Sequence, residues 1–293
     1  MPTKSIQTDV LEIAYLDEGP AGGPVVFLLH GWPDDVRAWQ QVAPCLHEAG
    51  LRTITPYLRG FGGTRFLSAG TIRDGRGVAL AQDAIDLADA LNIDTFYVAG
   101  HDWGGRAAYQ LAALFPGRIK KIASMALPFQ PRGAFSIPPF DQARLFWYQW
   151  LMCMEDGAEA VRKDPVGFAR IQWDTWGPAG WYEEDDFVTT AESFTNPDWA
   201  AITLHGYRSR FLPETNDPRY DGLQQQMTAI DQLRVPALVI VGAADTCDPL
   251  IASENMEHCF TAGYQRMVLE GIGHFPLREA PLAVGDALVK HFV

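Results

Sequence analysis

One short stretch, GHDWG at residues 100–104, combines an acidic side chain with the small residues that a sharp turn needs. It follows the predicted buried strand 95–99 and precedes a predicted helix over 106–115. A turn of the form G-x-nucleophile-x-G exposes its central side chain above a sheet. Asp102 stands at that centre and, with an ordinary pKa of ~3.9, could attack carbon and form an ester without a base. The same pattern is also typical of an aspartate that caps a helix.

A second turn, HGWP at residues 30–33, follows the apolar run 25–29. In a strand–elbow–helix architecture this loop supplies one backbone N–H of an oxyanion hole, and the residue after the nucleophile supplies the other. We therefore expect the N–H groups of Trp32 and Trp103 to be the two donors. A plain Gly-Pro turn is the structural alternative for residues 30–33.

Two later loops contain the remaining candidates for a triad. His274 ends a glycine-bounded loop after a late predicted strand, and we expect it to be a general base, although a surface histidine would fit the same position. Asp245 follows the predicted strand 237–241 and could hold the imidazole in one tautomer. Asp248 is the alternative acid, but an aspartate directly before a proline is usually a turn former.

The positions of these loops follow from an alternation of strands and helices. Strands are predicted over 11–16, 25–29, 52–56, 95–99, 122–127, 237–241 and 266–269. Helices are predicted over 34–48, 78–91, 106–115, near 251–260 and from 281. This rhythm indicates an α/β fold with a mostly parallel central sheet flanked by helices, and ligands then bind at the carboxyl ends of the strands.

The middle of the chain breaks this rhythm. Prolines cluster after residue 127, and helical stretches that contain six of the nine tryptophans follow. We interpret residues 129–225 as an inserted helical cap, with residues 1–128 and 226–293 as the two parts of one core. At ~150 residues per domain, a length of 293 residues suggests two consecutive domains. We instead interpret the chain as one split core with an insertion.

Charge and apolar runs exclude several classes of protein. The chain has 23 basic and 36 acidic residues, a net charge of −13, and such a field repels nucleic acid and anionic membranes. No apolar run approaches the ~20 residues of a membrane span, and the N-terminus lacks a signal-peptide pattern. The four cysteines show no metal-ligand spacing, so we expect reduced thiols, no metal site and a cytoplasmic protein.

Taken together, Asp102, Asp245 and His274 resemble the triad of the α/β-hydrolase superfamily, in the branch that uses an Asp nucleophile. The resemblance covers residues 1–128 and 226–293. Two activities in that branch, epoxide hydrolase and haloalkane dehalogenase, form an alkyl-enzyme ester that activated water later cleaves. HGWP is similar to the His-Gly-x-Pro loop of epoxide hydrolases, whereas haloalkane dehalogenases often have Asn where Trp32 stands.

The resemblance to epoxide hydrolases extends to two cap segments, FWYQW at 146–150 and HGYR at 205–208. It implies that Tyr148 and Tyr207 hydrogen-bond the epoxide oxygen, and that Trp32 and Trp103 join them in binding substrate. Phenols suit this role because a pKa near ~10 keeps them protonated at pH 7. The second segment departs from the family's Asn-Trp-Tyr-Arg, and His205 could either approach the pocket or be structural.

The resemblance thus implies an epoxide hydrolase that needs no cofactor and converts a small apolar or aromatic epoxide and water to a vicinal diol. A haloalkane dehalogenase with the same triad is the alternative, because that family uses a Trp beside its Asp to bind halide. A ligand-binding pseudoenzyme is the third possibility. We expect a monomer or a homodimer.

Overall fold

The computed structural model of the protein describes residues 3–135 and 137–293. Within this part of the chain one sheet has the strand order β1-β2-β4-β3-β6-β7-β8-β9, and β5 pairs with β2. All pairs from β4 to β9 are parallel, which confirms the predicted α/β sheet. The strands are β1 (Lys4–Gln7), β2 (Leu11–Glu18), β3 (Val25–Leu29), β4 (Arg52–Pro56), β5 (Arg65–Phe66), β6 (Phe96–His101), β7 (Ile119–Met125), β8 (Ala237–Gly242) and β9 (Tyr264–Leu269).

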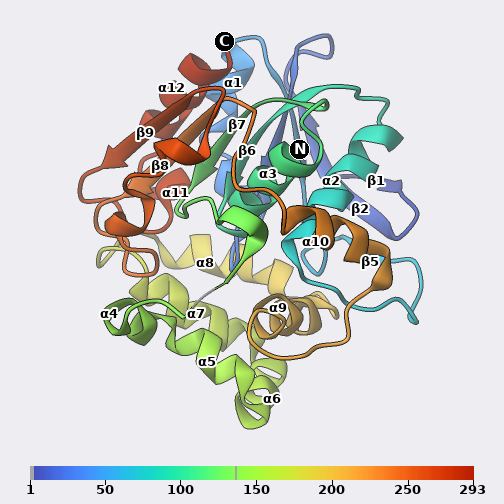
Figure 1. Ribbon diagram of the computed structural model, residues 1–293, viewed down its shortest axis with the longest axis vertical. Helices are drawn as coiled ribbons and strands as arrows, with labels where there is room; N and C mark the ends of the chain where they lie inside the picture. The colour runs from blue at the N-terminus through green and yellow to red at the C-terminus, as the bar shows by residue number, and fades with distance from the viewer. Residues whose placement is uncertain (1–2, 136) are drawn as a thin grey trace.

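Both faces of the central strands are covered by helices, as Figure 1 shows. Alternate residues of β3 reach opposite faces: Phe27 and Leu29 pack in the cluster that includes α2 and α3, and Val26 and Leu28 in the cluster that includes α1 and α12. A strand with two buried faces must be apolar at every position, which explains its sequence VVFLL. The core helices are α1 (Ala43–Glu48), α2 (Gly77–Ala90), α3 (Trp103–Leu114), α11 (Pro276–Glu279) and α12 (Pro281–Phe292).

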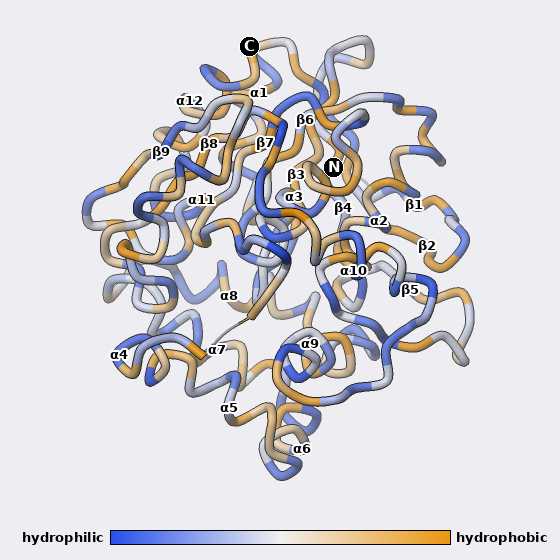
Figure 2. Tube along the Cα trace, viewed as in Figure 1, coloured by the Kyte–Doolittle hydropathy of each residue, from blue (hydrophilic) through white to orange (hydrophobic). Residues whose placement is uncertain are grey.

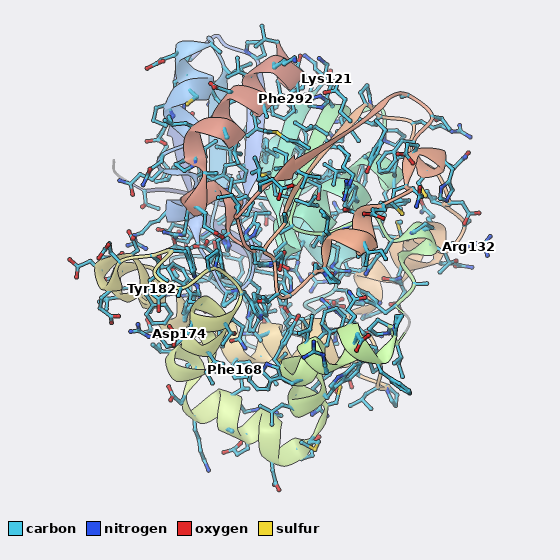
Figure 3. The ribbon with its side chains drawn as sticks, turned by 90° about the vertical axis from the view of Figure 1, so that its left-hand side faces the viewer. Lys121, Arg132, Phe168, Asp174, Tyr182 and Phe292 are labelled. Atoms are coloured by element: carbon cyan, nitrogen blue, oxygen red, sulfur yellow. The ribbon has the colours of Figure 1, made fainter. Side chains whose placement is uncertain are left out.

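The chain between β7 and β8 is helical and lies mainly below the carboxyl ends of the strands (Figure 1). In Figure 3, Phe168, Asp174 and Tyr182 of this segment lie toward one end of the molecule, and Lys121 and Phe292 toward the other. Our division into a core (1–128 and 226–293) and a cap (129–225) stays a prediction. The helices are α4 (Phe140–Ala143), α5 (Trp147–Cys153), α6 (Glu155–Lys163), α7 (Pro165–Thr175), α8 (Glu184–Ala191), α9 (Trp199–Arg208) and α10 (Asp221–Met227).

Two predicted helices are wrong in extent. Residues 34–48 form a 3-10 turn at Val36–Trp39 and then the short helix α1, because Pro44 lacks an N–H and is placed at the start of a helix. Residues 251–260 contain two 3-10 turns rather than an α-helix. Asn255 lies between these turns with φ of 57°, a left-handed conformation that a continuous helix does not accommodate.

Apolar residues are concentrated in the interior of the sheet. Figure 2 shows hydrophobic colouring along β8, which lies between β7 and β9. Every residue of β8 is buried. Among the described residues no helix has both the length and the hydropathy that crossing a membrane requires.

Candidate active site

The turn between β6 and α3 has the strained geometry of an elbow. Asp102 adopts φ of 48° and ψ of −113° and makes no side-chain hydrogen bond to the helix, so the helix-cap interpretation is wrong. A Cβ at Gly104 would lie 2.2 Å from the carbonyl oxygen of Leu29, and one at Gly31 would lie 2.7 Å from the Cβ of Asp102. Glycine at both positions therefore allows β3's loop to pass directly over the elbow.

The carboxylate of Asp102 is buried between groups from two different loops. Its Oδ1 accepts a hydrogen bond from the backbone N–H of Trp32 at 2.8 Å. Its Oδ2 lies 3.8 Å from Nε2 of His274. Burial by itself raises the pKa of Asp102, but the His274 imidazole and the Trp32 N–H outweigh it and lower the pKa to about 2. Asp102 is thus an ionised carboxylate at neutral pH.

His274 is held from its other side by Asp245. Nδ1 of His274 donates to Oδ2 of Asp245 at 2.8 Å, and Oδ1 of Asp245 accepts from the N–H groups of Cys247 (2.7 Å) and Asp248 (3.0 Å). The Nε2 atom is buried and has no hydrogen-bond partner among the described residues. Burial lowers the pKa of His274, but the two carboxylates beside it raise that pKa well above 6.5.

The sheet explains how residues far apart in the sequence meet here. β6, β7, β8 and β9 are parallel neighbours, so the loops after β6, β8 and β9 leave the same edge of the sheet. Those three loops carry Asp102, Asp245 and His274, respectively. The segment after α7 closes over them, since the N–H of His274 donates to the carbonyl of Trp176 at 2.9 Å.

The two tryptophans predicted for an oxyanion hole lie on either side of Asp102. Trp32 places its N–H on the carboxylate, and Trp103 is the first residue of α3, directly after Asp102. The two indoles stack with ring centroids 6.4 Å apart. The indole N–H of Trp32 is bound to Thr203 on α9 at 3.0 Å, which ties the helical segment to this loop.

The two predicted tyrosines also reach the site. Tyr148 on α5 and Tyr207 on α9 meet edge to face, with ring centroids 5.4 Å apart. Both line, together with Asp102, a cavity of about 60 Å³. Burial raises the pKa of each phenol well above 10, and for Tyr207 the charge of Asp102 adds to it. Both phenols are therefore protonated and able to donate a hydrogen bond at pH 7.

The sequence left two roles open for His205 and for Asp248, and the structure shows where each side chain lies. His205 does not line the cavity; its Nδ1 accepts from the N–H of Gly75 at 2.9 Å, so it joins α9 to the segment before α2. Asp248 does not contact His274 by a hydrogen bond but lines the cavity beside Tyr148. Burial and the charge of Asp245 raise the pKa of Asp248 to about 7.

Sequence reasoning missed two arginines of this cavity. Arg106 and Arg210 line it with Asp102, although neither lies in a recognised motif. The available signal was their spacing, because Arg106 follows Asp102 by four residues in the first turn of α3, and Arg210 follows Tyr207 by three, just past the end of α9. In the described part of the chain, no group of three or more His, Cys, Asp or Glu side chains is arranged to hold a metal ion.

Comparison with known proteins places this geometry in a family context. The model of the alpha/beta hydrolase fold family matches residues 24–281. Epoxide hydrolase A of Mycobacterium tuberculosis is 23% identical, over 97% of this chain and 95% of the relative.

Two solved structures resemble the whole molecule. A crystal structure from Klebsiella pneumoniae, provisionally described as an epoxide hydrolase, has a TM-score of 0.91 and 38% identity over 99% of this chain and 96% of that one. Epoxide hydrolase A from Mycobacterium thermoresistibile has a TM-score of 0.80 and 23% identity over 99% and 98% of the two chains, which shows the shared fold.

Proposed function

This chain belongs to the α/β-hydrolase fold family, and from that membership we propose that it is an epoxide hydrolase whose nucleophile is Asp102. The observation that carries the proposal is that the two oxygens of the Asp102 carboxylate have different contacts. Oδ1 is held by the Trp32 N–H, and Oδ2 lies free to react beside the unpartnered Nε2 of His274. The relatives named epoxide hydrolases support the choice of substrate class.

In the first step, Oδ2 of Asp102 attacks one ring carbon, and the carbon–oxygen bond of the epoxide breaks. The leaving oxygen takes a proton from Tyr148 or Tyr207, whose hydroxyl groups line the cavity above the nucleophile. The product is an ester between Asp102 and the opened substrate. Two phenols in a cavity closed off from bulk water stabilise the developing negative charge better than water does.

In the second step, Nε2 of His274 removes a proton from water, which attacks the ester carbonyl to give a tetrahedral intermediate. The bond between the carbonyl carbon and the substrate oxygen then breaks, and His274 returns its proton to that oxygen as the diol leaves. The proton of the regenerated Asp102 carboxyl passes to the tyrosinate, so both residues return to their starting states. Esterification removes the negative charge of Asp102, and with it one of the groups that raise the pKa of His274. The pKa of His274 therefore falls once the ester has formed, and a larger fraction of the imidazole is neutral and able to accept a proton from water. The backbone N–H groups of Trp32 and Trp103 would stabilise the oxyanion, and Asp245 keeps Nδ1 protonated.

The ester is tested with His274→Gln. This variant keeps the nucleophile but lacks the base, so it should accumulate protein whose mass has increased by that of one epoxide. A panel of aryl, alkyl and terminal epoxides is incubated with the variant, and the intact mass is measured. Asp102→Asn is the matched control and should remain unmodified. The two-step scheme would be refuted if the wild type formed a diol from an epoxide that left no adduct on Asp102 of the His274→Gln variant.

A haloalkane dehalogenase is the second candidate, because the indole N–H of Trp103 beside the nucleophile is buried and has no hydrogen-bond partner among the residues that the structure describes. Halide loss needs N–H donors and no proton, whereas epoxide opening needs an acid. Tyr148→Phe and Tyr207→Phe should therefore each lower the rate of diol formation by at least about tenfold, because a hydrogen bond to a charged oxygen is worth ~1.5–3 kcal/mol.

Tyr182→Phe is the control for these variants, since Tyr182 lies outside the cavity and bonds to Asp174. Diol and halide are quantified in parallel on matched epoxides and haloalkanes. Halide release by the wild type that exceeds diol formation, and that survives both tyrosine substitutions, would favour the dehalogenase.

A further inference from the structure

Two arginines, Arg106 and Arg210, follow the proposed catalytic residues Asp102 and Tyr207 by about one turn of the chain. The N–H of Arg106 donates to the carbonyl of Asp102 at 2.9 Å, within the first turn of α3. The N–H of Arg210 donates to the carbonyl of Tyr207 at 3.3 Å, and its guanidinium lies 4.3 Å from the Tyr207 ring centroid. Both cations line the same cavity as the proposed nucleophile Asp102 and the proposed acid Tyr207.

Neither arginine forms an ion pair with a carboxylate in the described part of the chain. Arg106 bonds to the amide oxygen of Gln130, and Arg210 to the carbonyl of Gly206 (3.0 Å) and the amide oxygen of Gln149 (3.2 Å). All of these acceptors are neutral. The Nε atom of Arg106 is moreover buried with no partner at all.

Three other arginines of low exposure are paired with acids. Arg59, Arg76 and Arg278 contact carboxylates at 2.6 Å. A buried cation without a counter-charge is costly, and the protein as a whole has 13 more acidic than basic residues. Burial and the nearby charge of Arg210 lower the pKa of Arg106 to about 10, so Arg106 remains cationic at pH 7.

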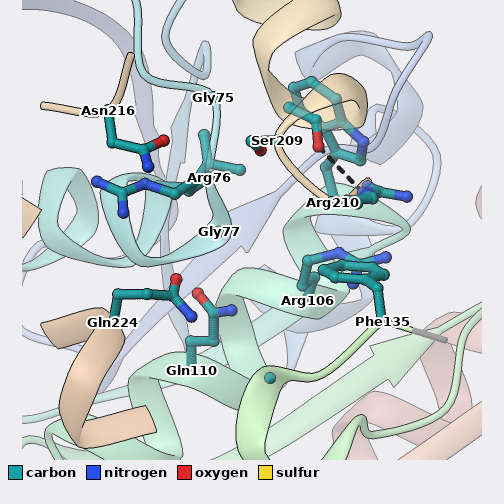
Figure 4. A pocket seen from close by; sticks show the side chains of 14 residues that line it. Gly75, Arg76, Gly77, Arg106, Gln110, Phe135, Ser209, Arg210, Asn216 and Gln224 are labelled. Carbon is teal, nitrogen blue, oxygen red and sulfur yellow. Dashed lines mark hydrogen bonds between the residues drawn. The ribbon is translucent and has the colours of Figure 1, made fainter. Parts of the chain in front are cut away.

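The two guanidinium groups frame a space that continues beyond the nucleophile. The Phe135 ring lies between them, 4.6 Å from Arg106 and 4.5 Å from Arg210. All three residues line both the small cavity at Asp102 and a neighbouring cavity of about 270 Å³. Figure 4 shows Arg106 and Arg210 on one side of this larger cavity, with the amides of Gln110 and Gln224 nearby.

We propose that Arg106 and Arg210 bind an anionic group of the carboxylate class carried by the epoxide substrate. A guanidinium fork matches the two oxygens of a carboxylate, and the ligand would pair with two arginines that share a cavity with Asp102 and Asp248 but form no ion pair with either in the described part of the chain. The proposal rests on the proposed epoxide hydrolase function and specifies its substrate: an epoxide with an apolar portion over the aromatic rings and an acid at the far end.

The test uses pairs of epoxides that differ only in a terminal carboxylate or its methyl ester, with two to six methylene groups between it and the ring. We expect the kcat/KM of the wild type to be at least about tenfold higher for the acid of the preferred length. Arg210→Met should reduce this acid-to-ester ratio at least about tenfold, and Arg210→Lys should restore part of it.

Arg208→Met is the matched control. Arg208 is in the same helical segment, but it pairs with Glu155 and Glu214 outside the cavity, so its removal should leave the acid-to-ester ratio unchanged. Equal kcat/KM for acid and ester in the wild type, or an equal loss for both in Arg210→Met, would overturn the proposal while leaving the epoxide hydrolase function intact.

A binding measurement separates the two proposals. Saturated carboxylates of the same chain lengths, and their primary amides, are titrated into the wild type and Arg210→Met by calorimetry. Carboxylate binding that is tighter than amide binding in the wild type, and that is lost in Arg210→Met, supports the anion site even if no epoxide is turned over. Equal binding of acid and amide rejects it, whatever the outcome with epoxides.

Discussion

Asp102 and His274 form a buried pair whose charges depend on one another. Each is shielded from water, and burial alone would favour the neutral form of both. The pKa of His274 is nevertheless raised, first by the charge of Asp245 and then by that of Asp102, and His274 in turn lowers the pKa of Asp102. At the scale of single residues, the charge state of each side chain therefore depends on its ionisable neighbours.

This coupling predicts how Asp102→Asn changes His274. The asparagine removes a negative charge, as esterification would, so the pKa of His274 should fall by about one to three pH units. In a titration toward high pH, the imidazolium of the variant therefore loses its proton at a lower pH than that of the wild type. The measurement is an NMR titration of the histidine side chains, with His291, whose pKa burial lowers to about 4, as an internal reference. An unchanged His274 titration would contradict the proposed coupling.

At the scale of elements, helix α9 sits against the core through its smallest residue. A Cβ at Gly206 would lie 2.8 Å and 2.9 Å from carbons of the Trp103 ring, and 3.0 Å from the carbonyl oxygen of Gly75. The same helix carries Thr203, which bonds to Trp32, and Tyr207. The position of α9 therefore sets both the aromatic cluster and one proposed proton donor.

Gly206→Ala should force α9 away from Trp103. Overpacking of this kind costs ~1–3 kcal/mol, and the free energy of unfolding measured in urea should fall by about that amount. Gly222→Ala is the control, since a Cβ there meets nothing within 4 Å, and alanine in a helix should stabilise the fold by ~0.5–1 kcal/mol. Gly206→Ala as stable as the wild type would show that the contact is easily relieved.

The extents of the elements show what local patterns can and cannot predict. β3 and β4 agree with their predicted bounds to the residue: β3 is an unbroken apolar run, as burial on both faces favours, and β4 is rich in β-branched residues. The helix over 34–48 failed because the apolar periodicity continues across Pro44, and the proline decides where a helix can start. Periodicity reports which face is buried, but it does not report where the backbone hydrogen bonds end.

At the scale of the whole molecule, Arg59 connects the core to the end of the helical segment. Its guanidinium donates hydrogen bonds to both carboxylate oxygens of Asp83 on α2, at 2.6 and 2.7 Å, and to the Tyr220 hydroxyl at 2.8 Å. The Arg59 side chain is fully buried. Three segments that are far apart in the sequence thus share one cation.

Arg59→Met would leave the Asp83 carboxylate buried without its partner. Breaking a buried ion pair typically costs ~3–5 kcal/mol, which should appear as a loss of unfolding free energy in urea. The double variant Arg59→Met/Asp83→Leu removes both charges and should recover most of that loss. Arg162→Met, which breaks an exposed pair with Glu159, should cost about 1 kcal/mol or less. A cost for Arg59→Met no larger than that of Arg162→Met would count against this role.

The sequence by itself determined the parts of the candidate site that depend on neighbours in the chain. An aspartate between glycines after an apolar strand predicts an elbow, because a sharp turn and close backbone approach need small residues at fixed positions. The order of the loops also indicated Asp102, Asp245 and His274. These inferences need only local sterics and the rule that parallel strands end at one edge.

Only the tertiary structure decided which distant groups meet. It placed Asp245 rather than Asp248 on His274, turned His205 toward Gly75, and, within the described residues, gave Arg106 and Arg210 neutral acceptors rather than carboxylates. Hydrogen bonds, burial and charge pairing depend on how loops from separate strands and helices pack. That information is absent from the spacing of residues along the chain, because contacts across the fold join segments that no local pattern relates.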